Sequence, residues 1–322
     1  MSFRDIKGQD SAIDFLKISV KNDKISHAYM FIGPSGVGKK LTAINFAKAI
    51  NCLDPKDAGP CDTCSQCKKI DASNHPDVFI FSPLKEDSSF GIDRIRALTK
   101  DIGLKPYEGR KKVYILDNAD SMTPEAQNAL LKTLEEPPSD SVLILIVENI
   151  NGIFSTVQSR AKRVRFFPIP AKEIEGILVN SYKMEKEKAE ILSRISSGML
   201  GKALKYNDED FFKARDRIIS ALNGEMILDS DFDGLSKPDM RLALDVMLTW
   251  YRDILLIKAG VANSSSLVNI DKLDLIQSEA KRSSFDGLNN IINQVILTGS
   301  LFEQNVNPKL AMGVLGINLT HR

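Results

Sequence analysis

The stretch of residues 33–39 constrains the fold of this chain more than any other. It reads Gly-Pro-Ser-Gly-Val-Gly-Lys directly after the apolar run 29–32, and it matches G-x-x-x-x-G-K, the phosphate loop. The glycines let backbone N–H groups converge on phosphate oxygens, while a lysine ammonium and the N-terminus of the next helix complement the negative charge. The sequence therefore predicts a strand, a phosphate-binding loop and a helix. The residues expected to contact a nucleotide are Gly33, Gly36, Gly38 and Lys39.

Two positions depart from the pattern of a hydrolysing enzyme. Where a Ser or Thr hydroxyl ordinarily reaches Mg²⁺, this chain has Lys40, and an ammonium has no lone pair for a cation. The apolar run 112–116 ends in Asp117, the usual place of a carboxylate that holds Mg²⁺ through water. The next residue is Asn118 instead of the Glu that orients the attacking water, and an amide cannot take a proton. We therefore predict a degenerate site that includes Lys40 and Asp117 and hydrolyses ATP negligibly; whether it still binds ATP or ADP is left open.

Runs of strand length alternate with runs of helical periodicity through the first half of the chain. The expected strands are residues 28–32, 77–81, 112–116, 142–147 and 163–167. One helix is expected to have Thr123 as its cap and Pro124 as its first residue, and to stop before Pro137. Strands that alternate with helices predict a parallel sheet in an α/β nucleotide-binding domain, with phosphates at the carboxyl edge of the sheet.

The pattern contains only helices after Pro168-Ile169-Pro170. Residues 171–206 predict a small bundle, and the remainder predicts longer helices. One of these is expected to run from Pro238, as its first residue, to a stop at Gly260. Its apolar stripe fits either a core or a surface for a partner helix. The stripe consists of Leu244, Met247, Leu248, Tyr251 and Leu255.

All four cysteines of the chain lie in one short stretch rich in Pro, Gly and polar residues. They are Cys52, Cys61, Cys64 and Cys67. Four thiolates on a compact loop, three of them in overlapping C-x2-C spacings, are typical of a tetrahedral Zn²⁺ site. Four unliganded thiols are the alternative, but free cysteines are usually scattered and buried. With four thiolate ligands no position stays open for water, so the predicted Zn²⁺ is structural.

The composition narrows the class of protein further. The chain has 322 residues, 43% hydrophobic and 26% charged, which is enough for two or three globular domains. A formal net charge of +1 excludes a globally basic nucleic-acid binder and leaves local patches open. The N-terminal residues contain no apolar signal core, and the longest apolar runs are far short of a membrane span. We therefore expect a cytoplasmic protein without a membrane partner.

Several motifs together resemble the bacterial clamp-loader AAA+ proteins of DNA polymerase III. They are the phosphate loop, the cysteine cluster directly after its helix, Asn-Ala-Leu-Leu-Lys-Thr-Leu-Glu-Glu-Pro-Pro at 128–138, Ser159-Arg160, and Asn-Val-Asn-Pro-Lys-Leu-Ala at 305–311. The resemblance covers essentially the whole chain. Because of Lys40 and Asn118, the chain is more similar to the members that do not hydrolyse ATP than to the gamma/tau motor.

The resemblance implies three domains: an AAA+ P-loop core over residues 1–167, a helical lid over 168–206 and a helical collar over 207–322. It also implies a five-membered ring with gamma/tau and delta subunits, which opens a sliding clamp and releases it on primer-template DNA. In such rings the arginine of a Ser-Arg pair acts as a finger on the nucleotide of a neighbour, and Arg160 is the matching residue. Without the motif, Arg160 would be interpreted as a surface arginine in a basic run.

Other interpretations remain open at the level of sequence. The first is an active ATPase, either a gamma/tau-like motor or a P-loop phosphotransferase. The second is a zinc-dependent nucleic-acid binding module, which only the cysteine cluster supports. In hydrolysing members of the family an arginine senses the nucleotide, and this chain has Gly201 at that position. The neighbouring Lys202 either substitutes for the arginine or is solvated. Contacts with DNA phosphates are a lesser expectation for Lys105, Arg110, Lys111 and Lys112.

Overall fold

The computed structural model divides the chain into two compact units. The first consists of residues 1–173 and 198–202, and the second of residues 174–197 and 203–322. The structure describes residues 2–83, 89–223, 236–261, 266–303 and 306–320. The closing motif at 305–311 lies partly outside these described residues. The finer division into core, lid and collar at residues 167 and 206 stays a prediction.

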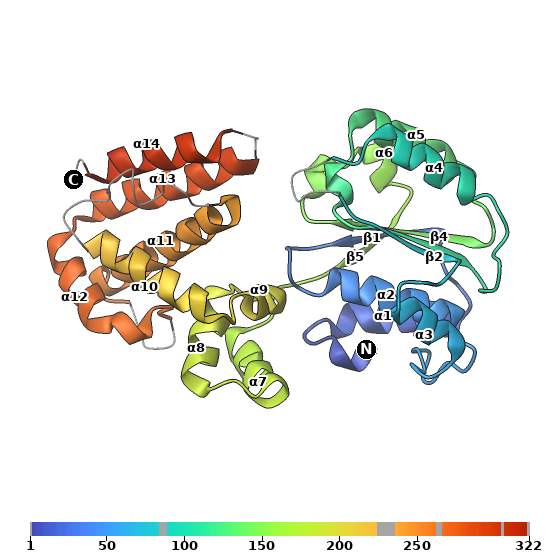
Figure 1. Ribbon diagram of the computed structural model, residues 1–322, viewed down its shortest axis with the longest axis horizontal. Helices are drawn as coiled ribbons and strands as arrows, with labels where there is room; N and C mark the ends of the chain where they lie inside the picture. The colour runs from blue at the N-terminus through green and yellow to red at the C-terminus, as the bar shows by residue number, and fades with distance from the viewer. Residues whose placement is uncertain (1, 84–88, 224–235, 262–265, 304–305, 321–322) are drawn as a thin grey trace. The chain divides into compact units, whose positions relative to one another are not determined.

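A parallel five-stranded sheet forms the centre of the first unit (Figure 1). Its strands are β1 (Ala28–Ile32), β2 (Val78–Phe81), β3 (Lys112–Leu116), β4 (Ser141–Val147) and β5 (Lys162–Arg165). They lie in the order β2-β3-β4-β1-β5, and every neighbouring pair is parallel. All carboxyl ends therefore meet at one edge, where the loops after β1, β2 and β3 lie. The expected α/β fold with a parallel sheet is confirmed.

Helices cover both faces of this sheet. In Figure 1, α1, α2 and α3 lie on one face, and α4, α5 and α6 lie on the other. Their bounds are η1 (Phe3–Asp5), α1 (Asp10–Lys21), α2 (Lys39–Asn51), α3 (Ser65–Asp71), α4 (Ile92–Asp101), η2 (Ala119–Ser121), α5 (Pro124–Glu135), η3 (Ile150–Gly152) and α6 (Ser155–Gln158). As expected, α5 begins at Pro124, and the Thr123 side chain accepts the N–H of Ala126 at 3.3 Å.

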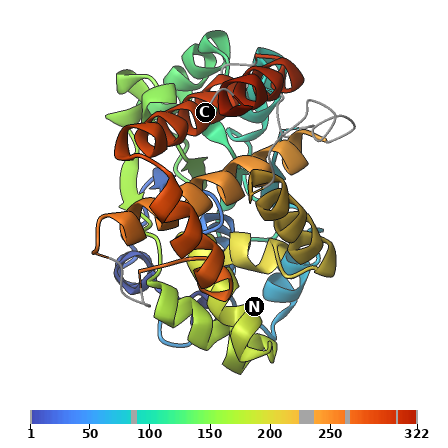
Figure 2. The same ribbon diagram turned by 90° about the vertical axis from the view of Figure 1, so that its left-hand side faces the viewer.

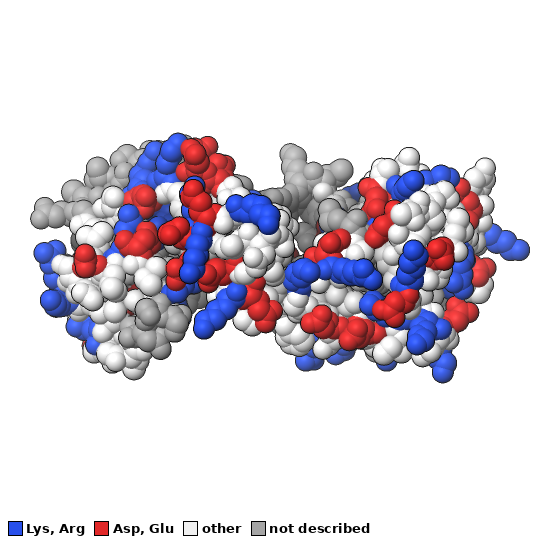
Figure 3. Space-filling view, turned by 90° about the horizontal axis from the view of Figure 1, so that it is seen from below, with Lys and Arg blue, Asp and Glu red and all other residues white. Residues whose placement is uncertain are grey.

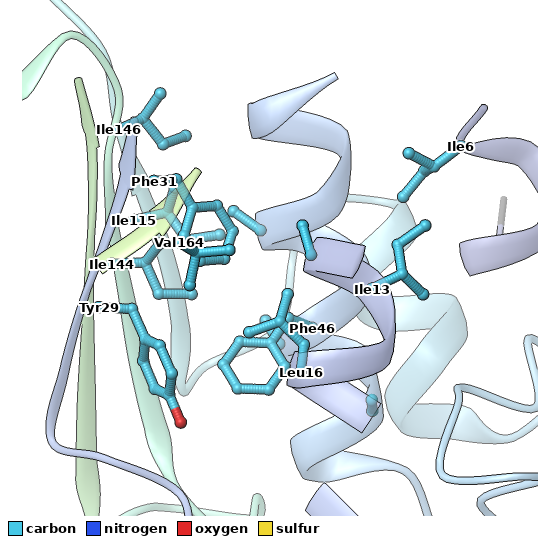
Figure 4. Close-up of a cluster of buried hydrophobic side chains, with 14 of the residues drawn as sticks. Ile6, Ile13, Leu16, Tyr29, Phe31, Phe46, Ile115, Ile144, Ile146 and Val164 are labelled. Atoms are coloured by element: carbon cyan, nitrogen blue, oxygen red, sulfur yellow. The ribbon is translucent and has the colours of Figure 1, made fainter. Parts of the chain in front are cut away.

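The alternation of strand side chains divides the core of the first unit between the two faces of the sheet. Tyr29 and Phe31 of β1 face α1 and α2, where they meet Leu16 and Phe46 (Figure 4). Met30, between them, faces the opposite layer with α4 and α5. Both faces of the sheet are therefore buried, which explains why the strands are continuous apolar runs and do not alternate between apolar and polar residues.

The last strand ends earlier than the sequence suggests, at Arg165 instead of residue 167. Phe166 N still donates to Ile32 O at 2.8 Å. The backbone of Phe167, however, is bonded to the Gln9 side chain, which donates to its carbonyl at 2.7 Å and accepts its N–H at 3.1 Å. The side chain of Gln9 thus takes the place of the hydrogen bonds that a neighbouring strand would make to the Phe167 backbone.

A buried carboxylate fixes the loop before β3. Asp77 is fully buried, and its oxygens accept the N–H groups of Tyr107, Glu108 and Gly109 at 2.7, 2.8 and 2.8 Å. Burial raises the pKa of Asp77, but these three donors outweigh it and hold the pKa below its ordinary value. The loop therefore depends on the charge of one side chain.

Replacing Asp77 with asparagine is expected to lower the free energy of unfolding by about 2–3 kcal/mol, because an amide NH₂ would face backbone donors and leave them unsatisfied. Since the pKa of Asp77 is lowered in the fold, its contribution is present above the unfolded-state pKa and is lost as pH falls below about 4. Urea unfolding between pH 3 and 7 measures this. The exposed Asp14→Asn serves as the control, and equal unfolding of the two variants would contradict the assignment.

All secondary-structure elements among the described residues of the second unit are helices (Figure 2). Its elements are α7 (Ala171–Tyr182), α8 (Lys186–Ile195), α9 (Leu200–Lys205), α10 (Glu209–Asn223), α11 (Lys237–Lys258), η5 (Ile270–Lys272), α12 (Leu273–Arg282), α13 (Phe285–Glu303) and α14 (Pro308–Thr320). The first residues of α7 and part of α9 belong to the first unit. In neither unit do the described helices include one that combines the length and the apolar character needed to cross a membrane.

The longest helix, α11, supplies much of the core of the second unit. The Ser236 side chain and Asp239 form a reciprocal cap, so the helix begins at residue 237 and Pro238 is its second residue, not its first as predicted. Met247, Trp250 and Tyr251 are each about 1% exposed. The apolar stripe was expected to form either a core or a surface for a partner helix. At Met247 and Tyr251 it forms part of the core.

Candidate functional site

The phosphate loop connects β1 to α2 in a backbone conformation that requires its glycines. Gly36 and Gly38 have φ angles of 77° and 98°, which L side chains rarely adopt. A Cβ atom on Gly33 would lie 2.5 Å from the carbonyl oxygen of Phe166. All three glycines predicted for the cradle therefore have a conformational or steric reason to be glycine.

Lys39 is the first residue of α2 and is 5% exposed. Its ammonium donates to the carbonyl oxygens of Gly33 and Pro34 at 2.5 and 2.7 Å. Burial lowers the pKa of Lys39, and the carboxylates of Glu148, Asp120 and Asp117 oppose this. The cation is thus held inside the curve of its own loop, with three carboxylates in its surroundings.

Lys40 lies against Asp117, the acid at the end of β3. The distance from Lys40 Nζ to Asp117 Oδ2 is 2.9 Å. Ser82, which follows β2, accepts a hydrogen bond from Lys40 Nζ at 3.2 Å and donates its hydroxyl to Asp117 Oδ2 at 3.3 Å. Lys40 and Asp117, which were predicted separately, therefore contact each other. Ser82 is a further residue of the site, and the sequence did not indicate it because it lies far from both along the chain.

Asn118 and Asp120 shape the loop after β3. Asn118 adopts the left-handed conformation, with φ of 57° and ψ of 48°, and directly precedes the short helix η2, without a capping hydrogen bond from its side chain. Asp120 accepts the N–H groups of Glu148 and Asn149 at 3.2 and 2.9 Å, which ties this loop to the end of β4. Asp120 was not singled out in the sequence, although it lies in the same acidic tetrapeptide as Asp117.

A short segment of residues 198–202 closes on the phosphate loop. Gly201 N donates to Gly36 O at 2.8 Å, and a Cβ atom on Gly201 would lie 2.9 Å from Gly36 Cα. The backbones approach each other this closely only because both residues are glycine. The predicted nucleotide-sensing position at Gly201 is therefore in direct contact with the cradle through its backbone.

The four cysteines converge on one point. Their sulfur atoms all lie within 4.8 Å of one another, and those of Cys52 and Cys64 are 4.0 Å apart. Tetrahedral Zn²⁺ with Zn–S bonds of about 2.3 Å requires sulfur separations of about 3.8 Å. Backbone N–H groups of Cys61, Cys64 and Cys67 point at neighbouring sulfurs at 3.3–3.5 Å. This arrangement can hold a metal ion.

The sulfur environments differ. The Thr63 hydroxyl, 3.5 Å from the Cys61 sulfur, is the main cause that lowers the pKa of Cys61 to about 6. Burial raises the pKa of Cys67 above its ordinary value. A bound cation would favour the thiolate at every position, including the buried one.

A buried lysine connects the cysteine loop to α2. Lys48 is fully buried, and its ammonium contacts the carboxylates of Asp62 and Asp71, the latter at 2.9 Å. Burial alone would lower the pKa of Lys48, but the two carboxylates raise it above its ordinary value. Lys48 thus anchors Asp62 of the cysteine loop and Asp71 at the end of α3 to the helix that begins at the cradle.

Arg160 follows the short helix α6 and is about one third exposed. Its guanidinium forms an ion pair with Glu135 Oε1 at 2.8 Å and donates to the carbonyl oxygen of Thr156 at 2.8 Å. Glu135 is the last residue of α5 and belongs to the Glu-Glu-Pro-Pro motif. The arrangement fixes the direction of the arginine and leaves about one third of its side chain exposed.

Three of the four basic residues considered for DNA contact have protein partners, and the fourth, Lys105, is exposed. Arg110 pairs with Asp23 at 3.3 Å, and Lys111 donates to the carbonyl oxygen of Ser139 at 2.8 Å. Lys112 is buried and pairs with Asp101 at 3.2 Å. On the face shown in Figure 3, positive and negative side chains are interspersed. These contacts give no support to a strong independent affinity for nucleic acid.

The parallel sheet, the phosphate loop after β1 and the helical C-terminal region define a P-loop protein of the AAA+ class. The family model described as DNA polymerase III, delta subunit, matches residues 8–170, and the model for the C terminal region of that subunit matches residues 209–318. Together with the delta-prime relatives given next, these matches show that the chain belongs to the delta-prime family of DNA polymerase III subunits and is a clamp-loader subunit.

Individual relatives agree with this family. DNA polymerase III subunit delta-prime of Bacillus subtilis is 30% identical over 309 residues, which cover 93% of this chain and 92% of that protein. The delta-prime subunit of Pseudomonas aeruginosa is 37% identical over 135 residues, 42% of this chain and 41% of that one. Subunit tau of Bacillus subtilis is 33% identical over 228 residues, 67% of this chain and 40% of tau.

Proposed function

We propose that this chain is the delta-prime subunit of a cytoplasmic bacterial replicative clamp loader, that it hydrolyses ATP negligibly, and that it supplies Arg160 to the nucleotide of a neighbouring subunit. The observation that carries this proposal is the Lys40–Asp117 ion pair of 2.9 Å, which occupies the two positions that ordinarily hold the nucleotide's magnesium ion. Its partners would be gamma/tau and delta subunits in a pentameric ring that loads a sliding clamp onto primer-template DNA.

Two departures act against hydrolysis in this cradle. Lys40 provides no oxygen for a metal ion, and Asn118 cannot accept a proton from the attacking water. The loss of a positioned base alone costs about 10²–10⁴ in rate. The cradle would therefore serve the fold and the binding of ATP or ADP rather than chemical turnover.

Arg160 is well suited to act on a nucleotide held elsewhere. It is partly exposed, its direction is fixed by Glu135, and a planar guanidinium can contact two phosphate oxygens at once. An arginine finger supplied in trans is worth about 10³–10⁵ in rate. Its role would thus be catalytic in a neighbour even though its own subunit is not a motor.

The four cysteines are proposed to bind a structural Zn²⁺. All four sulfurs would serve as ligands, so the ion would have no open position for water. Its contribution would be to fold residues 52–67 onto α2, together with Lys48. Only the cysteine cluster itself supports the alternative of a zinc-dependent nucleic-acid binding module.

Steady-state ATP turnover of the purified chain tests the central proposal. We expect turnover at background level, unchanged in Lys39→Ala, and a marked increase only when the chain is combined with gamma/tau and delta subunits and primed DNA. A chain that turns over ATP steadily by itself, and loses this activity in Lys39→Ala, would instead be a gamma/tau-like motor. The partial similarity to tau makes this the alternative to exclude.

A further inference from the structure

A P-loop fold ordinarily holds Mg²⁺ with a hydroxyl after the loop lysine and a carboxylate at the end of a neighbouring strand. The residues of this chain do not fit that ion. Position 40 presents an ammonium, and its Nζ is 2.9 Å from Asp117 Oδ2. A divalent cation at this carboxylate would lose one oxygen ligand and would meet a positive charge at ion-pair distance. The side-chain chemistry at position 40 therefore does not fit the Mg²⁺ site that is usual in this fold class.

We propose that Lys40 is the resident cation of the cradle, and that the ligand of this site is a nucleoside diphosphate or triphosphate without its magnesium ion. The inference rests on the proposed non-hydrolysing function and deepens it, because it names the form of the nucleotide that the site takes. It assigns Lys40 a binding role.

The hydrogen bonds around Lys40 hold its ammonium between three elements. Lys40 lies in the first turn of α2, Ser82 follows β2 and Asp117 follows β3. The two contacts to Ser82 and Asp117 use two of the three N–H donors of the ammonium. In the part of the chain that the structure describes, the third donor has no further partner and can donate to a phosphate oxygen, and the ion pair offsets the Asp117 charge that would repel a phosphate.

Apart from the carboxylate of Glu148, the remaining charged groups of the site are compatible with a metal-free anion. The backbone N–H groups of residues 33–39 and the N-terminus of α2 complement negative charge. Lys39 adds a second ammonium, and its contacts with Gly33 O and Pro34 O use two of its three donors. Asp120 accepts two backbone N–H groups, which reduces its repulsion toward a phosphate. Two lysines thus supply the positive charge of the site without a divalent ion, with one unit less charge than a lysine and Mg²⁺ would carry together.

The test measures binding of ADP to the full chain by calorimetry, once in EDTA and once in excess MgCl₂. For the wild type we expect the dissociation constant to change by less than about threefold between the two conditions, or binding to weaken in magnesium. In Lys40→Thr, which restores a hydroxyl and frees Asp117, magnesium should tighten ADP binding by about tenfold or more. The sign of the magnesium effect therefore depends on one residue.

A second variant separates the charge from the hydroxyl. Lys40→Met keeps the aliphatic stem but removes the ammonium, so metal-free ADP binding should weaken by about tenfold. Lys24→Thr, at an exposed position before β1, removes a positive charge away from the cradle and should behave as the wild type. Thermal unfolding of each variant checks that the fold is retained, which we expect because Lys40 is about half exposed.

Three results would overturn the inference. They are wild-type ADP binding that strengthens about tenfold with magnesium, no ADP binding to the wild type in either condition, and equal metal-free binding by wild type and Lys40→Met. None of these changes the expected effect of Arg160 on a neighbour's turnover. Conversely, an inert Arg160 would overturn the proposed function without altering the magnesium dependence of this cradle.

Discussion

Replacing Arg160 with alanine in a reconstituted clamp loader should slow ATP hydrolysis at the neighbouring site that it faces by about 10³–10⁵-fold. The physical reason is that alanine removes the positive charge that stabilises the transferring phosphoryl group in its transition state. Single-turnover hydrolysis stimulated by primed DNA measures this effect directly. Clamp loading, followed with a labelled sliding clamp, should fall in parallel.

Arg163 offers a matched control for this experiment. It lies on β5, three residues after Arg160, is exposed, and donates to the Gln158 side chain at 3.1 Å. Arg163→Ala removes the same charge from the same basic run and should leave turnover unchanged. If Arg160→Ala retains wild-type turnover and loading, or if both variants lose activity equally, the finger assignment is wrong.

Substituting serine for the buried Cys67 should abolish stoichiometric zinc binding and unfold the cysteine loop. Structural zinc sites have apparent binding free energies of about 10–16 kcal/mol, so loss of the ion is expected to produce the largest loss of stability of any single change considered. Elemental analysis and thermal unfolding measure the two effects, and a strong chelator should reproduce both in the wild type.

Ser65→Ala provides the comparison within the same loop, because Ser65 is exposed and lies between two cysteines without contributing a sulfur. It should retain zinc and unfold as the wild type does. Wild-type protein without stoichiometric zinc would contradict the assignment of the ligands. So would a Cys67→Ser variant that unfolds at the wild-type temperature.

Local sequence patterns were sufficient for much of the fold. The strand β1 and the start of α2 fall where the apolar run and the glycines place them, since both signals lie within a few residues of each other. The start of α5 was equally predictable from Thr123 and Pro124. Two of the boundaries that differ, at Phe167 and Pro238, were set by the Gln9 side chain and by the Ser236 cap.

The contacts that define the site could not be obtained in this way. Sequence reasoning found Lys40 and Asp117 separately, but their pairing depends on the strand order that places β3 near β1. Ser82 and Asp77 act on residues far along the chain, and no local periodicity indicates such partners. In the second unit, the buried Arg215 that contacts Asp271 at 2.7 Å was missed for the same reason.

The closure of Gly201 on Gly36 has a consequence for how the protein can be divided. Residues 198–202 belong to the first unit, although the chain on either side of them belongs to the second. The polypeptide therefore passes between the units three times, after residues 173, 197 and 202. A fragment that stops at residue 173 lacks the Gly198 carbonyl, which accepts the Ile169 N–H at 2.8 Å, as well as the donor to Gly36. The unit that carries the phosphate loop is therefore completed by residues 198–202, which follow the first helices of the helical unit in the chain.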